Sequence, residues 1–173
     1  TILDENFDAF VTGSGIASQA GAPWTTWSGA TGGSEDPLVT DAIYNSASNS
    51  VHVVAGNDLV LNLQDKTTGR YQITFDMNVA TGGVAYINLL QDFAGSTSEW
   101  ATQTFFNADG SLTTDAGGAD NGASYTITHD TWFNVTYIVD LNDDWATLYI
   151  DNTELVSWKF SGGSYGDGTL LDR

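Results

Sequence analysis

Strict alternation of apolar and polar side chains is the feature that most constrains the fold of this chain. In residues 71–79 every second side chain is apolar, and this set is Tyr71, Ile73, Phe75, Met77 and Val79. The polar set between them is Gln72, Thr74, Asp76 and Asn78. A strand places the two sets on opposite faces, whereas a helix would scatter them. We therefore predict a strand with the apolar set buried between two sheets, each full burial contributing roughly 1.5–3 kcal/mol.

Turn residues divide the rest of the chain into similar short segments, because pairs such as Gly82-Gly83 and Asp109-Gly110 favour tight turns. Besides 71–79 and 133–141, we predict strands over residues 50–55, 58–64, 84–91, 100–106, 123–128, 145–150 and 154–160. No segment indicates a helix longer than one turn. Many short strands with one apolar face each predict an all-β fold, a two-sheet antiparallel β-sandwich or jelly roll. We expect it to form a single domain over residues 1–173.

The charge of the chain excludes several partner classes. Acidic residues outnumber basic ones 22 to 4, for a net charge of −18. Nucleic acids and anionic membranes require basic patches, so neither is an expected partner. No apolar run reaches the ~18 residues of a membrane span. The absence of cysteine excludes disulfides and thiolate metal sites. The composition is acidic, poor in lysine and rich in threonine and asparagine. It predicts a secreted or cell-surface bacterial protein.

The hairpin-forming region 132–160 carries a family resemblance. Trp132 opens a strand, Asp140 ends it, and the return strand leads to the turn at Asp151-Asn152. This arrangement resembles the hairpin of concanavalin A-like and laminin G-like domains. The opening Glu5-Asn6-Phe7-Asp8, followed by two tryptophans, resembles secreted jelly-roll modules of Bacteroidetes. The resemblance implies a fold that serves lectins, glycan-binding modules, adhesins, glycosidases and lyases.

The resemblance also implies a last strand beyond the final residues Leu170-Leu171-Asp172-Arg173. We then expect a sandwich without that strand, in which Leu170 and Leu171 lie beside an open sheet edge. The partner at that edge would be a strand or domain from the same parent protein or from another chain. The alternative is a complete sandwich in which residues 162–173 form a surface tail.

Catalytic patterns are not evident in the sequence. The four glutamates are too far apart to share a strand, so the Glu-x-Asp-x-x-Glu pattern of retaining glycosidases of this fold is missing. We interpret His52 as a strand residue and His129 as a turn residue. No Walker or His-Glu-x-x-His motif occurs. We therefore predict no catalytic residues, and a glycosidase or lyase is an alternative only if carboxylates assemble in space.

Neutral polar groups beside aromatic rings are the groups that bind sugars. Amides and carboxylates bind hydroxyls, and flat rings cover the apolar C–H face of a pyranose. We predict a non-catalytic carbohydrate-binding module, with an adhesive or structural surface module as the alternative. The predicted ligand-binding tryptophans lie in or beside loops and are Trp24, Trp27 and Trp100. The predicted ligand-binding amides are Asn78, Asn88, Gln91 and Gln103.

Calcium is the one cofactor for which the chain offers ligands, because loop Asp and Asn oxygens suit it. Asp140, Asn142, Asp144 and Asp151 have the spacing of an EF-hand loop, but Trp145 stands where that loop needs glycine. We interpret that segment as a hairpin turn. The resemblance implies a structural calcium shared by N-terminal acids and a C-terminal aspartate, here Asp4, Glu5, Asp8 and Asp172.

Overall fold

The computed structural model describes residues 2–117, 124–163 and 168–173. Its internal contacts divide the chain into two compact units, Thr1–Leu63 and Gln64–Arg173. The prediction of one domain over residues 1–173 stays a prediction.

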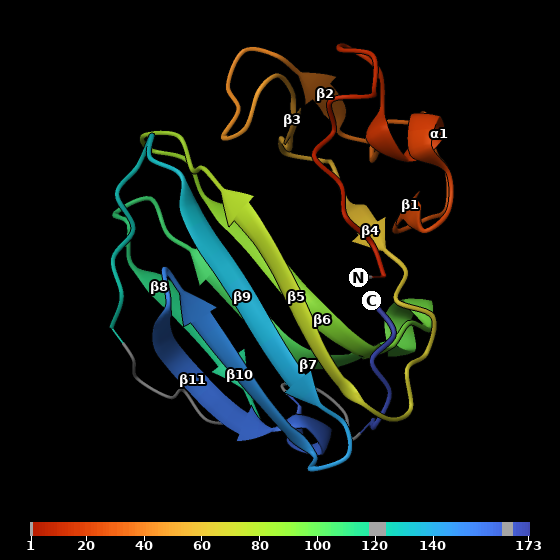
Figure 1. Cartoon of the computed structure of the whole chain (residues 1–173), viewed down its shortest axis with the longest axis vertical. Helices are drawn as coiled ribbons and strands as arrows, with labels where there is room; N and C mark the ends of the chain where they lie inside the picture. The colour runs from red at the N-terminus through yellow and green to blue at the C-terminus, as the bar shows by residue number, and fades with distance from the viewer. Residues whose placement is uncertain (1, 118–123, 164–167) are drawn as a thin grey trace. The chain divides into compact units, whose positions relative to one another are not determined.

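The first unit holds one short helix and four short strands (Figure 1). They are α1 (Ile16–Ala20), β1 (Trp24–Thr26), β2 (Leu38–Thr40), β3 (Ser50–His52) and β4 (Leu59–Leu61). The strands form two antiparallel pairs, β1 with β4 and β2 with β3. The predicted segments 50–55 and 58–64 thus shorten to three residues each, and β1 and β2 were not expected.

The helix α1 exceeds the single turn that the sequence led us to expect, and a distant carboxylate explains it. The Asp36 carboxylate accepts the backbone N–H groups of Ala17, Ser18 and Gly32, each at 2.8 Å. Burial raises the pKa of Asp36, but these hydrogen bonds outweigh burial and hold that pKa below its ordinary value. Asp36 therefore stabilises the start of α1 from 19 residues away along the chain, which no local pattern reveals.

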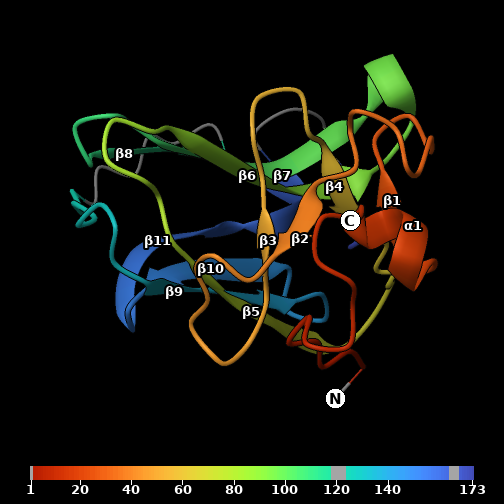
Figure 2. The same cartoon turned by 90° about the horizontal axis from the view of Figure 1, so that it is seen from above.

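The second unit is a two-layer antiparallel sandwich, and Figure 2 shows its two sheets as separate layers. One sheet has the order β11-β10-β9-β5, formed by β5 (Arg70–Met77), β9 (Phe133–Asp140), β10 (Trp145–Ile150) and β11 (Thr153–Lys159). The other has the order β6-β7-β8, formed by β6 (Ala85–Asp92), β7 (Glu99–Phe106) and β8 (Leu112–Ala116). Two short 3₁₀ turns, η1 (Gly95–Thr97) and η2 (Phe160–Gly162), complete the elements. The predicted all-β, two-sheet antiparallel β-sandwich is confirmed.

The core lies between the two sheets. On β9 every second side chain is buried, and these are Phe133, Val135, Tyr137 and Val139. Ala146, Leu148 and Ile150 of β10 lie directly opposite residues of this set and are also fully buried. The rings of Phe133 on β9 and Phe106 on β7 lie 5.5 Å apart between centroids and join the layers.

The strand over residues 71–79 forms as β5, and its register agrees with the predicted faces. Gln72, Thr74 and Asp76 are exposed, and Val79 is buried. However, full burial holds only for Val79, because Tyr71, Ile73 and Met77 are half-buried. The predicted burial of Phe75 is wrong, since it is 36% exposed. The physical reason is position, since β5 ends the order of its sheet and has a strand neighbour, β9, on one side only. An edge strand covers its inward face less completely than a central strand does.

The other predicted strands vary in outcome. The ranges 84–91, 100–106, 145–150 and 154–160 agree with β6, β7, β10 and β11 to within one or two residues at each end. Of the range 123–128, residue 123 lies outside the described residues, and Thr126 makes an isolated bridge with Ser111. The sequence did not predict β8, because its residues 112–116 include two adjacent threonines and an aspartate and alternate poorly.

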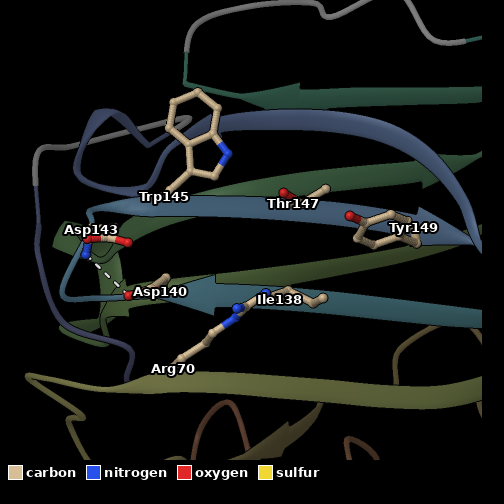
Figure 3. A pocket seen from close by; sticks show the side chains of 7 residues that line it. All are labelled: Arg70, Ile138, Asp140, Asp143, Trp145, Thr147 and Tyr149. Atoms are coloured by element: carbon tan, nitrogen blue, oxygen red, sulfur yellow. Dashed lines mark hydrogen bonds between the residues drawn. The ribbon is translucent and has the colours of Figure 1, made fainter.

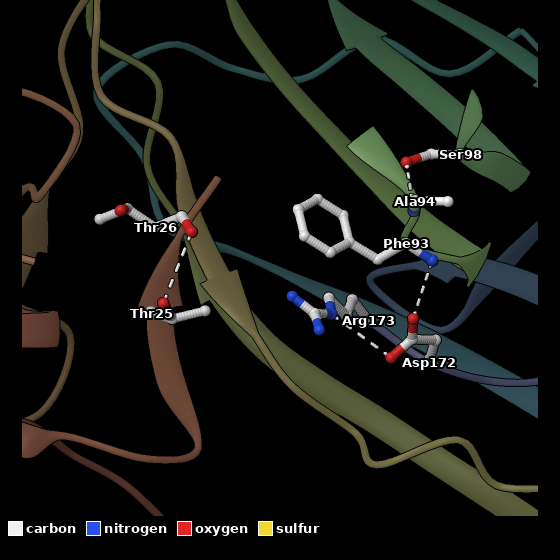
Figure 4. Close-up of polar contacts among 7 residues, drawn as sticks. All are labelled: Thr25, Thr26, Phe93, Ala94, Ser98, Asp172 and Arg173. Atoms are coloured by element: carbon white, nitrogen blue, oxygen red, sulfur yellow. Dashed lines mark hydrogen bonds and ion pairs between the residues drawn. The ribbon is translucent and has the colours of Figure 1, made fainter. Parts of the chain in front are cut away.

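The C-terminal residues lie against the edge of β6. Leu171 is fully buried and exchanges two backbone hydrogen bonds with Lys66, at 2.9 and 3.0 Å. The Leu90 N–H donates to the Arg173 carbonyl oxygen at 2.6 Å. Figure 4 shows the Asp172 carboxylate accepting the Phe93 N–H at 2.8 Å and pairing with the Arg173 guanidinium at 3.3 Å. Leu171 thus lies near the edge of β6, and residues 171–173 pair with Leu90 and Lys66 rather than forming a surface tail. A further strand beyond them stays a prediction.

Candidate functional site

Period-two alternation places a group of aromatic and polar side chains on the outer face of the four-stranded sheet. Residues directly opposite one another in an antiparallel pair share a face. The register aligns Arg70, Asp140 and Trp145 in one row across β5, β9 and β10. Ile138 and Thr147 are opposite each other in the next row. The same strand that buries Leu148 therefore presents its alternate side chains outward.

These rows form a hollow of about 430 Å³, drawn in Figure 3. The residues that line it are Arg70, Ile138, Asp140, Asp143, Trp145, Thr147 and Tyr149. Three strands and the β9–β10 hairpin tip contribute them. The sandwich is built so that regular, hydrogen-bonded backbone positions every lining side chain except Asp143, which belongs to the tip.

The hairpin tip is held by its own polar groups. The Asp140 carboxylate accepts the backbone N–H groups of Asn142 at 3.1 Å and Asp143 at 3.2 Å. The Asn142 side chain in turn accepts the Gly69 N–H at 3.1 Å, which ties the tip to the turn before β5. The tip is a hairpin turn, in agreement with our interpretation of this segment. It holds two carboxylates at one end of the hollow.

A second set of contacts anchors the other side of the tip. The Asp144 carboxylate accepts the Ser161 backbone N–H and hydroxyl, both at 2.7 Å, and pairs with the Lys159 ammonium at 3.3 Å. Burial raises the pKa of Asp144, but the Ser161 hydrogen bonds and the Lys159 charge outweigh burial and lower that pKa overall. The tip is therefore tied to β11 and η2 by an ionised carboxylate.

The aromatic and cationic groups of the hollow are available to a ligand. The Trp145 side chain is 48% exposed, and Figure 3 shows its ring standing beside Thr147. Arg70 extends from β5 toward Ile138 (Figure 3). Neither of the two ion pairs among the described residues includes Arg70. The Arg70 guanidinium thus takes part in neither ion pair and lies in the same hollow as the exposed indole.

The Thr147 hydroxyl adds an acceptor to the floor of the hollow. Its oxygen lies 2.9 Å from the Ser157 hydroxyl oxygen, and Ser157 donates to the Glu154 carboxylate at 2.8 Å. Because a serine hydroxyl has one proton, Thr147 must be the donor to Ser157. The lone pairs of the Thr147 oxygen therefore remain as acceptors. Together the hollow offers two rings, a guanidinium, a hydroxyl and two carboxylates, a set suited to a ligand with apolar faces and many hydroxyls.

The outer face of the three-stranded sheet carries a different arrangement. Tyr86 on β6 and Phe105 on β7 are 42% and 41% exposed, and their ring centroids lie 4.8 Å apart. The Tyr86 hydroxyl donates to the Gln103 side-chain oxygen at 2.9 Å. Asn88 lies directly opposite Gln103 in the β6–β7 pair. These rings and amides contact one another across neighbouring strands.

The predicted ligand-binding residues are distributed over both units. Trp24 and Trp27 belong to the first unit, where the Trp24 ring packs 5.9 Å from the Phe7 ring. Trp100 lies on β7 opposite Leu90 and is half-buried. Asn88 and Gln103 are brought together, as described above. The structure therefore does not assemble the predicted tryptophans and amides as one site within either unit.

Two of the predicted amides are enclosed. Gln91 is fully buried and donates to the Phe160 carbonyl oxygen, so we correct its assignment from ligand contact to interior anchor. The side-chain nitrogen of Asn78 is buried and has no hydrogen-bond partner among the described residues. The sequence analysis missed Trp145, Tyr149 and Arg70. The signal was present for two of them, because Trp145 and Tyr149 alternate with the apolar residues of 145–150.

The predicted calcium ligands make other contacts. Glu5 accepts the Phe7 N–H at 2.7 Å, and Asp8 accepts the N–H groups of Ser48 at 2.5 Å and Asn49 at 3.1 Å. Asp4 is exposed, and Asp172 has the partners described above. Within the described residues, no three His, Cys, Asp or Glu side chains group in a way that could hold a metal ion. A structural calcium stays a prediction.

The negative charge of Asp172 acts on a neighbouring carboxyl group. Its charge and its hydrogen bond raise the pKa of Asp65 above the ordinary value.

In the part of the chain that the structure describes, no helix is both long and apolar enough to cross a membrane.

Comparison with known proteins supports the fold. No family model matches the sequence, and no curated protein matches it. A solved structure titled sialidase superposes with a TM-score of 0.60 at 13% identity, covering 98% of this chain and 14% of that chain. A native heptameric SAP-like pentraxin from Limulus polyphemus superposes with a TM-score of 0.40 at 13% identity, covering 64% of this chain and 53% of that chain. The chain thus spans about a seventh of the sialidase structure, and it shares with that region an antiparallel β-sandwich fold.

Proposed function

We propose that this chain is a non-catalytic carbohydrate-binding module of a secreted or cell-surface protein, and that it binds a neutral glycan in the hollow beside Trp145. The observation that carries the proposal is a half-exposed indole on β10, in the same hollow as a guanidinium that takes part in neither ion pair of the described residues. Indole rings stack on the apolar C–H face of a sugar. Flanking charged groups bind its hydroxyls through strengthened hydrogen bonds.

The charge of the hollow favours a neutral ligand over an acidic one. Asp140 and Asp143 contribute two negative charges against the one positive charge of Arg70. The whole chain carries −18, which repels polyanions at long range. A neutral glycan is repelled neither by the carboxylates of the hollow nor by the charge of the whole chain. Its hydroxyls can still donate to the carboxylates and accept from Arg70.

The test compares two exposed aromatic residues on opposite sheets. Trp145→Ala removes the ring in the hollow, and Phe105→Ala removes a similarly exposed ring from the other outer face. Binding to an array of neutral and acidic glycans is measured for both variants after circular dichroism confirms their folding. We expect Trp145→Ala to weaken binding by about tenfold or more, which corresponds to about 1.4 kcal/mol. Phe105→Ala should bind as the parent does.

Two results would contradict the proposal. Undiminished binding by folded Trp145→Ala would exclude the hollow, and absence of binding to any glycan on the array would exclude the function. The bound glycan is also recovered and its length measured. Recovery of the intact glycan is expected, whereas shortened products would favour the glycosidase or lyase alternative, with Asp140 and Asp143 as the carboxylates to replace first.

A further inference from the structure

We infer that the hollow binds an internal stretch of a linear glycan, which lies along β10 and contacts Trp145 and Tyr149 at the same time. This inference rests on the proposed function and specifies its ligand. It excludes a site that recognises a single terminal sugar.

The spacing of the two aromatic residues is the first argument. Trp145 and Tyr149 are both on the outward face of β10 and are four residues apart, so their Cα atoms are separated by about 13 Å at ~3.3 Å per residue. One sugar ring is no wider than the indole on which it stacks. A single sugar therefore cannot cover both aromatic side chains, whereas consecutive sugars of one chain can.

The shape of the hollow between them is the second argument. Thr147 separates the two aromatic residues along β10, and it is only 8% exposed, so it forms a low floor together with Ile138. Arg70 lies on β5, two strands away from Trp145 and about 10 Å from it at ~4.8 Å per strand. The lining residues thus extend about 13 Å along the strands and about 10 Å across them, with Trp145 and Arg70 on opposite sides.

The distribution of polar groups is the third argument. Asp140, Asp143 and Arg70 cluster at the end near the hairpin tip. The Thr147 hydroxyl oxygen is in the middle, and Tyr149 is at the far end. A ligand that satisfied only one cluster would leave the others to water, whereas a chain of sugars presents hydroxyls along its whole length.

Next to Tyr149, the outer face of the sheet continues as a polar surface formed by β9 and β5. Thr136 lies opposite Tyr149, and its hydroxyl oxygen is 2.9 Å from that of Thr74 on β5. The Asn134 amide donates to the Asp76 carboxylate at 2.8 Å. These side chains are already held by one another, so they present a fixed polar surface over which a longer glycan can extend.

The experiment measures affinity against chain length. Cello-, laminari-, xylo- and manno-oligosaccharides, each from the monosaccharide to the hexasaccharide, are titrated calorimetrically into the parent chain. We expect affinity in at least one series to rise steeply over the first few units and then to level. In that series, Tyr149→Ala should weaken tetrasaccharide binding by about tenfold and change disaccharide binding by less than about twofold. Tyr149→Phe keeps the ring and serves as the matched control that should retain most of the affinity.

The outcomes separate the inference from the proposed function. If the monosaccharide binds as tightly as the tetrasaccharide, or if Tyr149→Ala weakens both probes equally, the inference is overturned while glycan binding stands. If no oligosaccharide binds in any series and the array also shows no binding, the proposed function fails and the inference fails with it.

Discussion

The two outer faces of the sandwich expose aromatic rings to a similar extent but use them differently. Tyr86 and Phe105 on the three-stranded sheet pack against each other, and the Tyr86 hydroxyl is bonded to Gln103. Trp145 on the four-stranded sheet stands beside small and polar groups in a hollow. Exposed area therefore does not distinguish a binding ring from a structural one. The contacts of the ring and of its polar neighbours do.

The difference arises from register rather than from composition. On the three-stranded sheet, Tyr86 lies directly opposite Phe105, so two large side chains meet across a strand pair. On the four-stranded sheet, Trp145 lies between Asp140 and Lys159, and Thr147 lies opposite Ile138. Large residues alternate with small ones there, which leaves a hollow. The same alternation can thus build a closed face or an open one.

The largest expected effect separates the inner face of β10 from its outer face. Leu148→Ala removes a fully buried side chain and should reduce the free energy of unfolding by about 2–5 kcal/mol, because a cavity remains. Tyr149→Ala, one residue along, should reduce it by less than about 1 kcal/mol. Urea denaturation of both variants gives the values. Similar losses would mean that the outer face of β10 is packed as tightly as the core.

The next effect tests whether the ring pair is structural. Phe105→Ala removes the partner of Tyr86 and should lower the free energy of unfolding by about 1 kcal/mol. Trp145→Ala should change it by no more than about 0.5 kcal/mol, although it removes a larger ring. Thermal melts and urea denaturation of the two variants check this ordering. The comparison breaks down if Trp145→Ala proves the more destabilising change.

A smaller effect concerns the hydroxyl groups of the two tyrosines. Tyr86→Phe deletes the hydrogen bond to Gln103 and should cost about 0.5–1 kcal/mol of stability. Tyr149→Phe should leave stability unchanged. Parallel urea titrations measure both, and equal losses would show that the Tyr149 hydroxyl is also bonded within the folded chain.

The smallest effect concerns pH and the hairpin tip beside the hollow. Since the pKa of Asp144 is lowered by folding, its contribution to stability is present above the ordinary value of 3.8 and is lost as the pH falls below it. Because the pair with Lys159 is partly exposed, Asp144→Asn should lower the melting temperature by about 1–2 °C at pH 7. The difference between variant and parent should narrow steadily as the pH falls below 3.8. A constant difference across this range would show that the contribution of Asp144 is not its charge.

The sequence alone was sufficient for the strands with a regular pattern. The alternation in 71–79 and 133–141 predicted β5 and β9 and the faces that they present, because a strand repeats every two residues. It was not sufficient for Phe75, whose exposure depends on β5 ending the order of its sheet. It was also not sufficient for β8, which depends on pairing with β7. Nor was it sufficient for α1, which depends on the Asp36 carboxylate.

For the proposed site, the sequence predicted the class of ligand, and the tertiary structure decided which residues share one face. Neutral polar residues, aromatic rings and a charge of −18 together indicated a glycan ligand from composition alone. The loop tryptophans were the natural candidates, yet the hollow is formed by Trp145 and Arg70, residues 75 positions apart. Their meeting depends on the order β10-β9-β5 and on the register Trp145, Asp140, Arg70. Pattern within one strand determines which face a side chain joins, and only the pairing of distant strands decides which side chains share that face.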